Sequence, residues 1–346
     1  SKPTPPSSSV RRAGSKSPRR RRQQEQPTTT PMHATPGGNT THRKNKRSKQ
    51  QRNRSNIHWT KEIKILSLLD FTSGSGRPFT QLVRHIPSKH IFALHVIPSQ
   101  TQNMFELARQ AVVALRVDHP NICRCYGTTQ VGESIQFLWE RGPSTINTHI
   151  QRAHIEEGKA PTQSQKWMVE LIRALSHLHS VGIVHRDVLT QNIMILRDGS
   201  LRLNSFGISK YLAKARTTTI CGEPTNMAPE RVLGRPHGFG VDWWSVGLVM
   251  HEMYSGTPLF PLKVNARHNY KEEKINNGNG MGIYERIVGC RYQVANNVDP
   301  ALADCIRRLV SHEIHRLGVC GIDREGSCGA EVLLYMSTRN WWDEEE

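Results

Sequence analysis

The pattern of apolar and polar positions changes near residue 57. Residues 1–56 consist mostly of Ser, Thr, Pro, Gln, Arg and Lys and contain almost no side chain to bury. Such a segment cannot offset the entropy that is lost on ordering, so the pattern predicts that it is disordered. From Trp59 onward, apolar residues recur at the spacings of strands and helices. We therefore expect a basic tail over residues 1–56 and a folded domain over residues 57–346.

Strand signals dominate the first part of that domain. Residues 81–97 contain two β-type apolar runs around a Pro-Ser-Lys turn, which is typical of a hairpin. Residues 121–127 and 135–140 are two further apolar runs that we expect to be strands. Residues 104–117, between the hairpin and these strands, have apolar side chains at helical spacing.

Helical signals dominate the second part. Amphipathic or apolar runs predict helices over residues 165–180, 242–256, 282–288 and 300–314. A polar stretch near residues 263–282 interrupts them and is expected to be a surface loop. A strand-rich part followed by a helical part predicts an α+β fold made of two lobes.

The formal charge of +18 is concentrated in the tail. Residues 1–56 carry 15 Lys and Arg against one acid, Glu25, which leaves only +4 for the other 290 residues. Basic clusters at 16–22 and 43–54 are typical of segments that bind import receptors, nucleic-acid phosphates or anionic membrane surfaces. Among these alternatives nuclear import is favoured.

Composition also restricts the compartment. There is no run of about 18 apolar residues and no apolar stretch at the N-terminus, so neither a transmembrane segment nor a secretory signal is expected. Seven scattered cysteines are typical of reduced thiols rather than of a disulfide framework. An intracellular protein of the nucleus or the cytoplasm is therefore predicted.

Several ordered motifs carry the functional information. His185, Arg186, Asp187 and Asn192 form the pattern H-R-D-x-x-x-x-N, and Ser205-Phe206-Gly207 follow. The further motifs are ALHVI (93–97), CGEPTNMAPE (221–230), VDWWSVG (241–247) and HRLG (315–318). Together they resemble the eukaryotic protein kinase fold over residues 58–342, and within it the AGC branch of Ser/Thr kinases. The resemblance implies an N-lobe over 57–139, a C-lobe over 140–346, and ATP with Mg²⁺ or Mn²⁺ as cofactors.

The resemblance assigns three catalytic-loop roles that this chain keeps. Asp187 stands at the position of the catalytic base, and Asn192 at that of a ligand to the second metal ion. Arg186 is expected to pair with a phosphate on the activation segment, and Thr219 is the best-aligned acceptor of that phosphate. The other reading of Asp187 is purely structural, through hydrogen bonds within its loop.

Other positions that handle ATP and metal have changed. His95 replaces the lysine that holds the phosphates, Gln110 replaces its glutamate partner, and Ser205 replaces the D-F-G aspartate. An imidazole is shorter and less charged than a lysine, and a neutral hydroxyl is a weak ligand for Mg²⁺. Of the glycine-rich loop, Gly74 and Gly76 remain.

The hinge and the peptide-binding positions follow the same comparison. Glu140 marks the hinge, and Trp139 before it stands at the gatekeeper position, where it would narrow the pocket behind adenine. The positions that meet phosphate or peptide in relatives are also substituted, namely Leu189 for Lys, Gln191 for Glu, Glu223 for Thr, and Thr225 and Asn226 for Glu and Tyr.

The structural positions are kept. Glu230 and Arg316 match a buried ion pair between the activation segment and the large lobe, and Asp242 matches the aspartate that anchors the catalytic loop. His185 and Phe206 match the internal spine. The fold is therefore expected to persist although the residues around ATP have changed.

These observations favour a pseudokinase of AGC type that acts as a regulatory or scaffold protein, binds other proteins, and has weak or absent phosphotransfer. The first alternative is an active Ser/Thr kinase with atypical handling of metal and phosphate, in which Asp187 and Asn192 keep their roles. A third interpretation makes the basic tail a nucleic-acid-binding segment and the kinase-like fold an interaction module.

Overall fold

A computed structural model describes residues 62–71, 79–98, 113, 117–212, 216–261, 281–319 and 328–338. The chain divides into two units, Ser1–Ile57 and His58–Glu346, and every described residue belongs to the second. The predictions for the tail, for most of the helix at 104–117 and for most of the polar loop near 263–282 lie outside the described residues. So do Gly74, Gly76 and Gln110.

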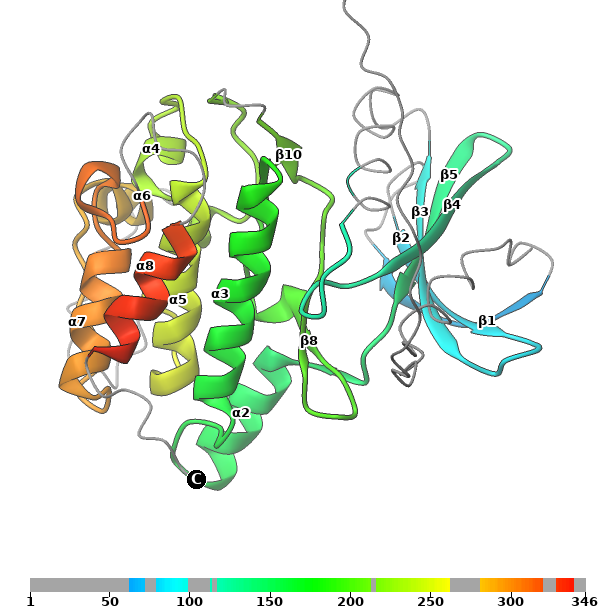
Figure 1. Ribbon diagram of the computed structural model, residues 1–346, viewed down its shortest axis with the longest axis horizontal. Helices are drawn as coiled ribbons and strands as arrows, with labels where there is room; N and C mark the ends of the chain where they lie inside the picture. The colour runs from blue at the N-terminus through cyan, green and yellow to red at the C-terminus, as the bar shows by residue number, and fades with distance from the viewer. Residues whose placement is uncertain are drawn as a thin grey trace, which may run out of the picture. The chain divides into compact units, whose positions relative to one another are not determined.

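The first part of the described chain is an antiparallel sheet of five strands in the order β1-β2-β3-β5-β4 (Figure 1). The strands are β1 (Ile63–Phe71), β2 (Phe79–His85), β3 (Ile91–Pro98), β4 (Cys125–Val131) and β5 (Ser134–Glu140). Val83, Leu94 and Leu138 are buried together on one face of the sheet. Strand alternation thus produces a small core within the sheet.

The second part is mainly helical (Figure 1). It holds the larger hydrophobic core. Its helices are α2 (Ile146–Glu156), α3 (Ser164–Ser180), α4 (Pro229–Val232), α5 (Gly240–Ser255), α6 (Met281–Val288), α7 (Pro300–Leu309) and α8 (Cys328–Ser337), with 3₁₀ turns η3 (Thr190–Asn192), η4 (Pro224–Asn226) and η7 (Glu313–His315). Helix α5 is buried nearly all round, and Trp243 and Trp244 on it are fully buried. It ends at Gly256, whose φ of 77° is a left-handed cap that glycine adopts without strain.

Short strands position the catalytic-loop motif. β6 (Ser144–Thr145), β8 (Ile193–Ile195) and β9 (Leu201–Leu203) form one small sheet, and β7 (Ile183–Val184) pairs with β10 (Lys210–Tyr211). The motif lies between β7 and β8, and β9 leads to Ser205. Two antiparallel pairs therefore hold both ends of the loop and bring its residues close to Ser205.

The structure confirms the α+β architecture and the type of most predicted elements. The hairpin over 81–97 is β2 and β3, and the helices predicted over 165–180 and 242–256 are α3 and α5. None of the helices among the described residues is long and apolar enough to cross a bilayer.

Two predicted boundaries were wrong. The strand predicted over 121–127 begins only at Cys125, because Ile122 forms a parallel bridge with Leu203 and the Cys123 amide donates to the Leu203 carbonyl. The helix predicted over 300–314 ends at Leu309, and the backbone then turns at Val310. In both places a contact with a distant segment decides the local backbone.

Candidate functional site

The carboxylate of Asp187 is the centre of the candidate site. Its Oδ2 accepts hydrogen bonds from Nδ2 of Asn192 at 2.8 Å and from the hydroxyl of Ser205 at 2.7 Å. Nδ2 of Asn192 also donates to the Asp187 carbonyl at 3.0 Å. The structure thus brings together the three residues that sequence comparison places at the base and metal positions.

Ser205 reaches Asp187 through an unusual backbone conformation. Its φ is 68°, in the left-handed region that residues other than glycine rarely adopt. This conformation costs free energy and is retained only where surrounding contacts impose it. Here the adjoining strand β9 and the burial of Phe206 restrain the segment.

The donor set of this site does not fit Mg²⁺. Asp187 contributes a carboxylate, Asn192 an amide and Ser205 a neutral hydroxyl, whereas Mg²⁺ is held in phosphate-transferring sites mainly by carboxylates and substrate phosphates. The Ser205 hydroxyl donates its proton to Asp187 in a hydrogen bond. Where an aspartate would add a second negative charge for the metal ion, this chain therefore has only a neutral donor.

His95 is on β3, where the phosphate-binding lysine was expected. Its Nδ1 lies 3.0 Å from Oγ1 of Thr80, the residue opposite it on β2. The imidazole is half-buried and is held by this cross-strand hydrogen bond. A ring in this position has neither the reach nor the permanent charge of a lysine for contacting phosphate.

An aromatic stack joins the five-stranded sheet to the catalytic loop. The ring of Trp139, on β5, stacks on Phe206 with centroids 5.7 Å apart and an angle of 9°. Phe206 in turn meets His185 edge-on at 5.1 Å, and Nε2 of His185 donates to the Asn204 carbonyl at 2.8 Å. The large side chain expected at the gatekeeper position therefore packs directly against the residue that follows Ser205.

The carboxylate of Glu140, at the expected hinge, is engaged by its own chain. It lies 3.4 Å from Nε of Arg202 and accepts a hydrogen bond from the Arg124 amide at 3.2 Å. Both charged side chains are largely buried, so the pair holds the end of β5 against β9. Glu140 thus has a structural role here.

Asp242 anchors the catalytic loop, as sequence comparison implied. Its two oxygens accept hydrogen bonds from the amides of His185 at 2.9 Å and Arg186 at 2.7 Å, and from Nε2 of His179 at 2.8 Å. Burial alone would raise the pKa of Asp242, but the hydrogen bond and charge of His179, together with His185, outweigh it and lower the pKa. The φ of Arg186, 68°, is maintained by this anchoring.

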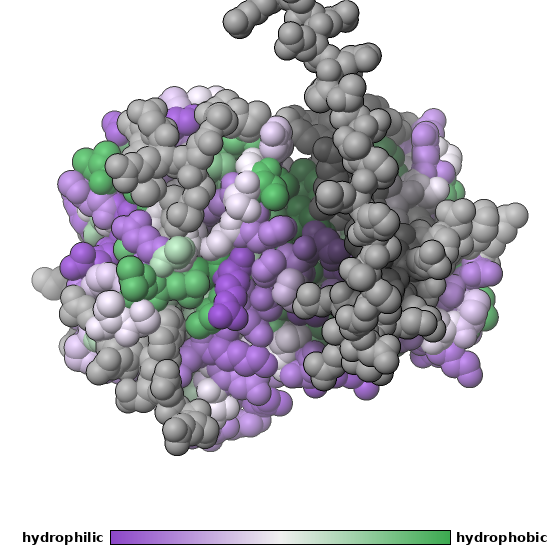
Figure 2. Space-filling view, viewed as in Figure 1, coloured by the Kyte–Doolittle hydropathy of each residue, from purple (hydrophilic) through white to green (hydrophobic). Residues whose placement is uncertain are grey.

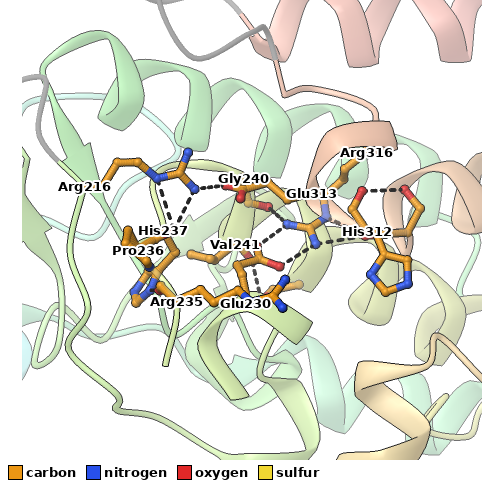
Figure 3. Close-up of polar contacts among 12 residues, drawn as sticks. Arg216, Glu230, Arg235, Pro236, His237, Gly240, Val241, His312, Glu313 and Arg316 are labelled. Carbon is orange, nitrogen blue, oxygen red and sulfur yellow. Dashed lines mark hydrogen bonds and ion pairs between the residues drawn. The ribbon is translucent and has the colours of Figure 1, made fainter. Parts of the chain in front are cut away.

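Glu230 and Arg316 form the expected buried ion pair (Figure 3). The two nitrogens of the guanidinium donate to the two carboxylate oxygens at 2.6 and 3.0 Å, and Arg316 also donates to the carbonyls of Gly240 and Ser311. Burial alone would raise the pKa of Glu230, but the hydrogen bond and charge of Arg316 lower it overall. This pair ties α4 to the segment that follows α7.

Three cationic side chains that sequence reasoning missed hold the activation segment. Arg216 pairs with Glu313 and donates to the Pro236 carbonyl (Figure 3). Arg231, which is buried, donates to the carbonyls of Arg186 and Cys221. The third, Lys210, is on β10 and follows Ser205 by five residues, and no motif in the sequence singles it out.

Lys210 lies beside the candidate acceptor threonines. Its Nζ is 2.9 Å from Oγ1 of Thr217 and 3.4 Å from Oγ1 of Thr219. Thr217 is buried and its backbone pairs with His237, whereas Thr219 is exposed. Arg186 donates through Nε to the Ile208 carbonyl at 2.7 Å, on the same segment.

We expect Thr219, and not Thr217, to be the phosphorylated threonine when the chain is isolated from cells. A kinase can reach the exposed hydroxyl, and Lys210 beside it would stabilise the phosphate by a charge-assisted hydrogen bond. Phosphopeptide mapping should show a signal that is lost in Thr219→Ala and retained in Thr217→Ala. A dominant phosphosite at Thr217, or none in this segment, would contradict the expectation.

Comparison with known proteins gives a consistent result. The chain matches the family model described as protein kinase domain over residues 74–320. It is 32% identical over 269 residues to the human cAMP-dependent protein kinase catalytic subunit PRKX, and the aligned region covers 74% of this chain and 70% of that protein. It is 28% identical over 244 residues to a Caenorhabditis briggsae protein named cAMP-dependent protein kinase, catalytic subunit-like. That alignment covers 70% of this chain and 57% of the relative. An Aurora kinase of Schizosaccharomyces pombe is 29% identical over 208 residues, which are 60% of this chain and 54% of the Aurora kinase. The chain thus spans little more than half the length of two of these relatives.

Proposed function

The chain belongs to the protein kinase family, and we propose that it is a pseudokinase of AGC type, a regulatory or scaffold protein with weak or absent phosphotransfer. Catalysis in this family consists mainly of positioning phosphates and stabilising their charge with cations held in fixed places. The proposal follows from how the residues at those places are engaged in this chain.

The observation that carries the proposal is the hydrogen bond from Ser205 to Asp187. A substrate hydroxyl would have to approach the carboxylate of Asp187 for its proton to be accepted. In this chain Oδ2 of that carboxylate already accepts from Ser205 at 2.7 Å and from Asn192 at 2.8 Å. The residue that should supply a second carboxylate for metal instead uses its hydroxyl to hold the base in place.

The engagement of His95 supports the same conclusion. The imidazole is bound to Thr80 within the sheet, so the strand that should present a permanent positive charge to phosphate presents none. Stabilisation of phosphate charge is usually the largest single contribution to catalysis of this kind, and its loss is expected to outweigh the retention of Asp187.

The remaining contacts support a role as a folded platform. The stack of Trp139 on Phe206, the anchoring of Asp242 and the buried pair of Glu230 with Arg316 each connect separate segments of the chain. A protein that orders its lobes and its activation segment in this way can present a constant surface to other proteins, which we propose as its partners.

A second candidate function is that of an active protein Ser/Thr kinase with atypical metal use. It is favoured by the proximity of Asp187 and Asn192 and by relatives whose names describe kinases. A phosphotransfer assay with generic protein substrates separates the two. The pseudokinase proposal expects no metal-dependent incorporation above that of Asp187→Asn, whereas robust incorporation that Asp187→Asn abolishes would establish the active kinase.

Ser205→Asp is expected to increase the affinity for ATP in the presence of Mg²⁺ by about tenfold, or ~1.4 kcal/mol, because it supplies the missing carboxylate. Aspartate tolerates the left-handed backbone at this position better than most residues, so the fold should be retained. The measurement is a calorimetric titration with and without Mg²⁺. Ser205→Ala is the matched control, since it removes the hydrogen bond without adding charge, and an equal effect of both variants would count against the explanation.

A further inference from the structure

One exposed surface combines apolar and positively charged side chains and takes no part in the site around Asp187. We define the activation-segment surface as Arg216, Ile220, Leu233 and Arg235, all exposed. The residues are joined by contacts, since Arg216 donates to the carbonyl of Pro236, next to Arg235 (Figure 3). The tip of Ile220 approaches Gly234, where a Cβ would lie 3.7 Å from it. The surface therefore combines two apolar side chains with two arginines.

A buried positive charge lies beneath this surface. Arg231 is 2% exposed, and its guanidinium donates to the carbonyls of Cys221 and, at 3.1 Å, Arg186. Its Nε has no hydrogen-bond partner among the described residues. Carbonyl oxygens satisfy part of the guanidinium but do not neutralise it, and within the described ranges no carboxylate forms an ion pair with Arg231. A buried charge without a counter-ion is costly.

The acids of this region leave the positive charge in excess. Glu230 is bound by Arg316, and Glu313 by Arg216, so two of the carboxylates are already paired. Glu223 is exposed on the same segment and is the remaining acid there. Against it stand the charges of Arg231 and Arg235. Burial lowers the pKa of His237, and the nearby charges of Arg231 and Arg186 act in the same direction.

We propose that the activation-segment surface docks a segment of another protein in which an apolar side chain is flanked by Asp or Glu. The apolar side chain would cover Ile220 and Leu233, whose exposure is otherwise unfavourable. The acids would meet Arg235 at the surface and the field of Arg231 beneath it. The proposal rests on the proposed function, because it makes this face a docking site for a partner instead of a site that presents a substrate for phosphorylation.

Substitutions in the same region agree with this choice of partner. By the resemblance, Gln191 replaces a glutamate that contacts substrate arginine in relatives, and Thr225 replaces a glutamate of the segment that receives the peptide. An arginine, Arg231, directly follows Glu230 and adds positive charge beneath this surface. The preference for a basic peptide is thus weakened and attraction for an acidic one is strengthened.

The test is fluorescence anisotropy of the full chain with three labelled peptides of equal length. Each carries a central Ile-Leu pair, flanked by Glu, by Ser or by Lys. We expect the Glu peptide to bind at least about tenfold more tightly than the Lys peptide, with a difference that narrows between about 50 and about 200 mM salt. No binding, or equal or stronger binding of the Lys peptide, would overturn the proposal.

Variants localise the binding. Arg235→Glu is expected to weaken binding of the Glu peptide at least about fivefold, since the side chain at position 235 is exposed and the substitution reverses its charge. Ile220→Ser should weaken the binding of all three peptides, because it removes an apolar contact that they share. Arg197→Glu is the control, because it reverses the charge of an exposed side chain elsewhere in the chain. It should change the affinities of the three peptides only slightly and to the same extent. An equal loss in Arg197→Glu and Arg235→Glu would show non-specific attraction and overturn the proposal.

The two proposals fail separately in these experiments. Metal-dependent phosphotransfer that Asp187→Asn abolishes would refute the pseudokinase, whichever peptide binds. Absent phosphotransfer without preference for the Glu peptide would refute only the docking surface.

Discussion

Arg316→Ala is expected to lower the free energy of unfolding by about 3–5 kcal/mol, because it leaves the buried carboxylate of Glu230 without its partner. The same change removes donors to the carbonyls of Gly240 and Ser311 and the contact of the guanidinium with the ring of Trp244. The measurement is equilibrium unfolding by urea of the full chain. A loss below about 1 kcal/mol would contradict the account.

Lys159→Ala is the matched control for that experiment. It removes the cation of an exposed pair, in which Lys159 and Glu157 are 63% and 51% exposed, and should cost less than about 0.5 kcal/mol. The buried pair also predicts a dependence on pH. The pKa of Glu230 is lowered from 4.5 in the folded protein, so its contribution is present above pH 4.5 and is lost as the pH falls through the lower folded value.

Asp242→Ala is expected to be similarly damaging, with a loss of about 2–4 kcal/mol and a mobile catalytic loop. Two backbone amides, of His185 and Arg186, lose their acceptor, and neither can be reached by water without opening the core. Hydrogen exchange should show faster exchange of these two amides. The Asp187–Ser205 hydrogen bond should weaken with them, because it depends on the position of the loop.

Asp198→Ala provides the comparison for the loop. Its carboxylate is exposed and bonds only locally to Ser200 in the turn before β9. Exchange at His185 and Arg186 should be unchanged in this variant. Unchanged exchange of the same amides in Asp242→Ala would show that the loop is held by other contacts.

Much of the fold could be predicted because the decisive signals are local. The alternation over 81–97 and the helical period over 165–180 identify β2, β3 and α3 to within two residues. The boundary at Cys125 could not be predicted in this way. Ile122 and Cys123 continue the apolar pattern of the strand, but they pair with Leu203, about 80 positions away in the chain.

For the candidate site, residue types were predictable and contacts were not. That Ser205 cannot serve as a carboxylate follows from its identity. That its hydroxyl lies on Oδ2 of Asp187 depends on a backbone φ of 68°, which no spacing of apolar residues indicates. Likewise, Thr80 was not identified as the partner of His95, because cross-strand register depends on the hairpin as a whole.

Arg231 illustrates a different limit. An arginine side chain is normally solvated, and nothing in the sequence marks this one, on the short helix α4, as buried. Its burial results from the closeness of Cys221 and Arg186, where the activation segment meets the catalytic loop. A buried charge of this kind becomes visible only when segments about 45 residues apart are seen together.

The central claim is that this chain keeps the kinase fold without a metal-dependent nucleotide site. It is tested most directly by calorimetric titration of the full chain with ATP alone, with Mg²⁺ and with Mn²⁺, followed by a phosphotransfer assay. The account predicts that neither metal increases the affinity for ATP and that no phosphate is transferred above the level of Asp187→Asn. Binding that requires Mg²⁺ or Mn²⁺, together with phosphotransfer that Asp187→Asn abolishes, would contradict it.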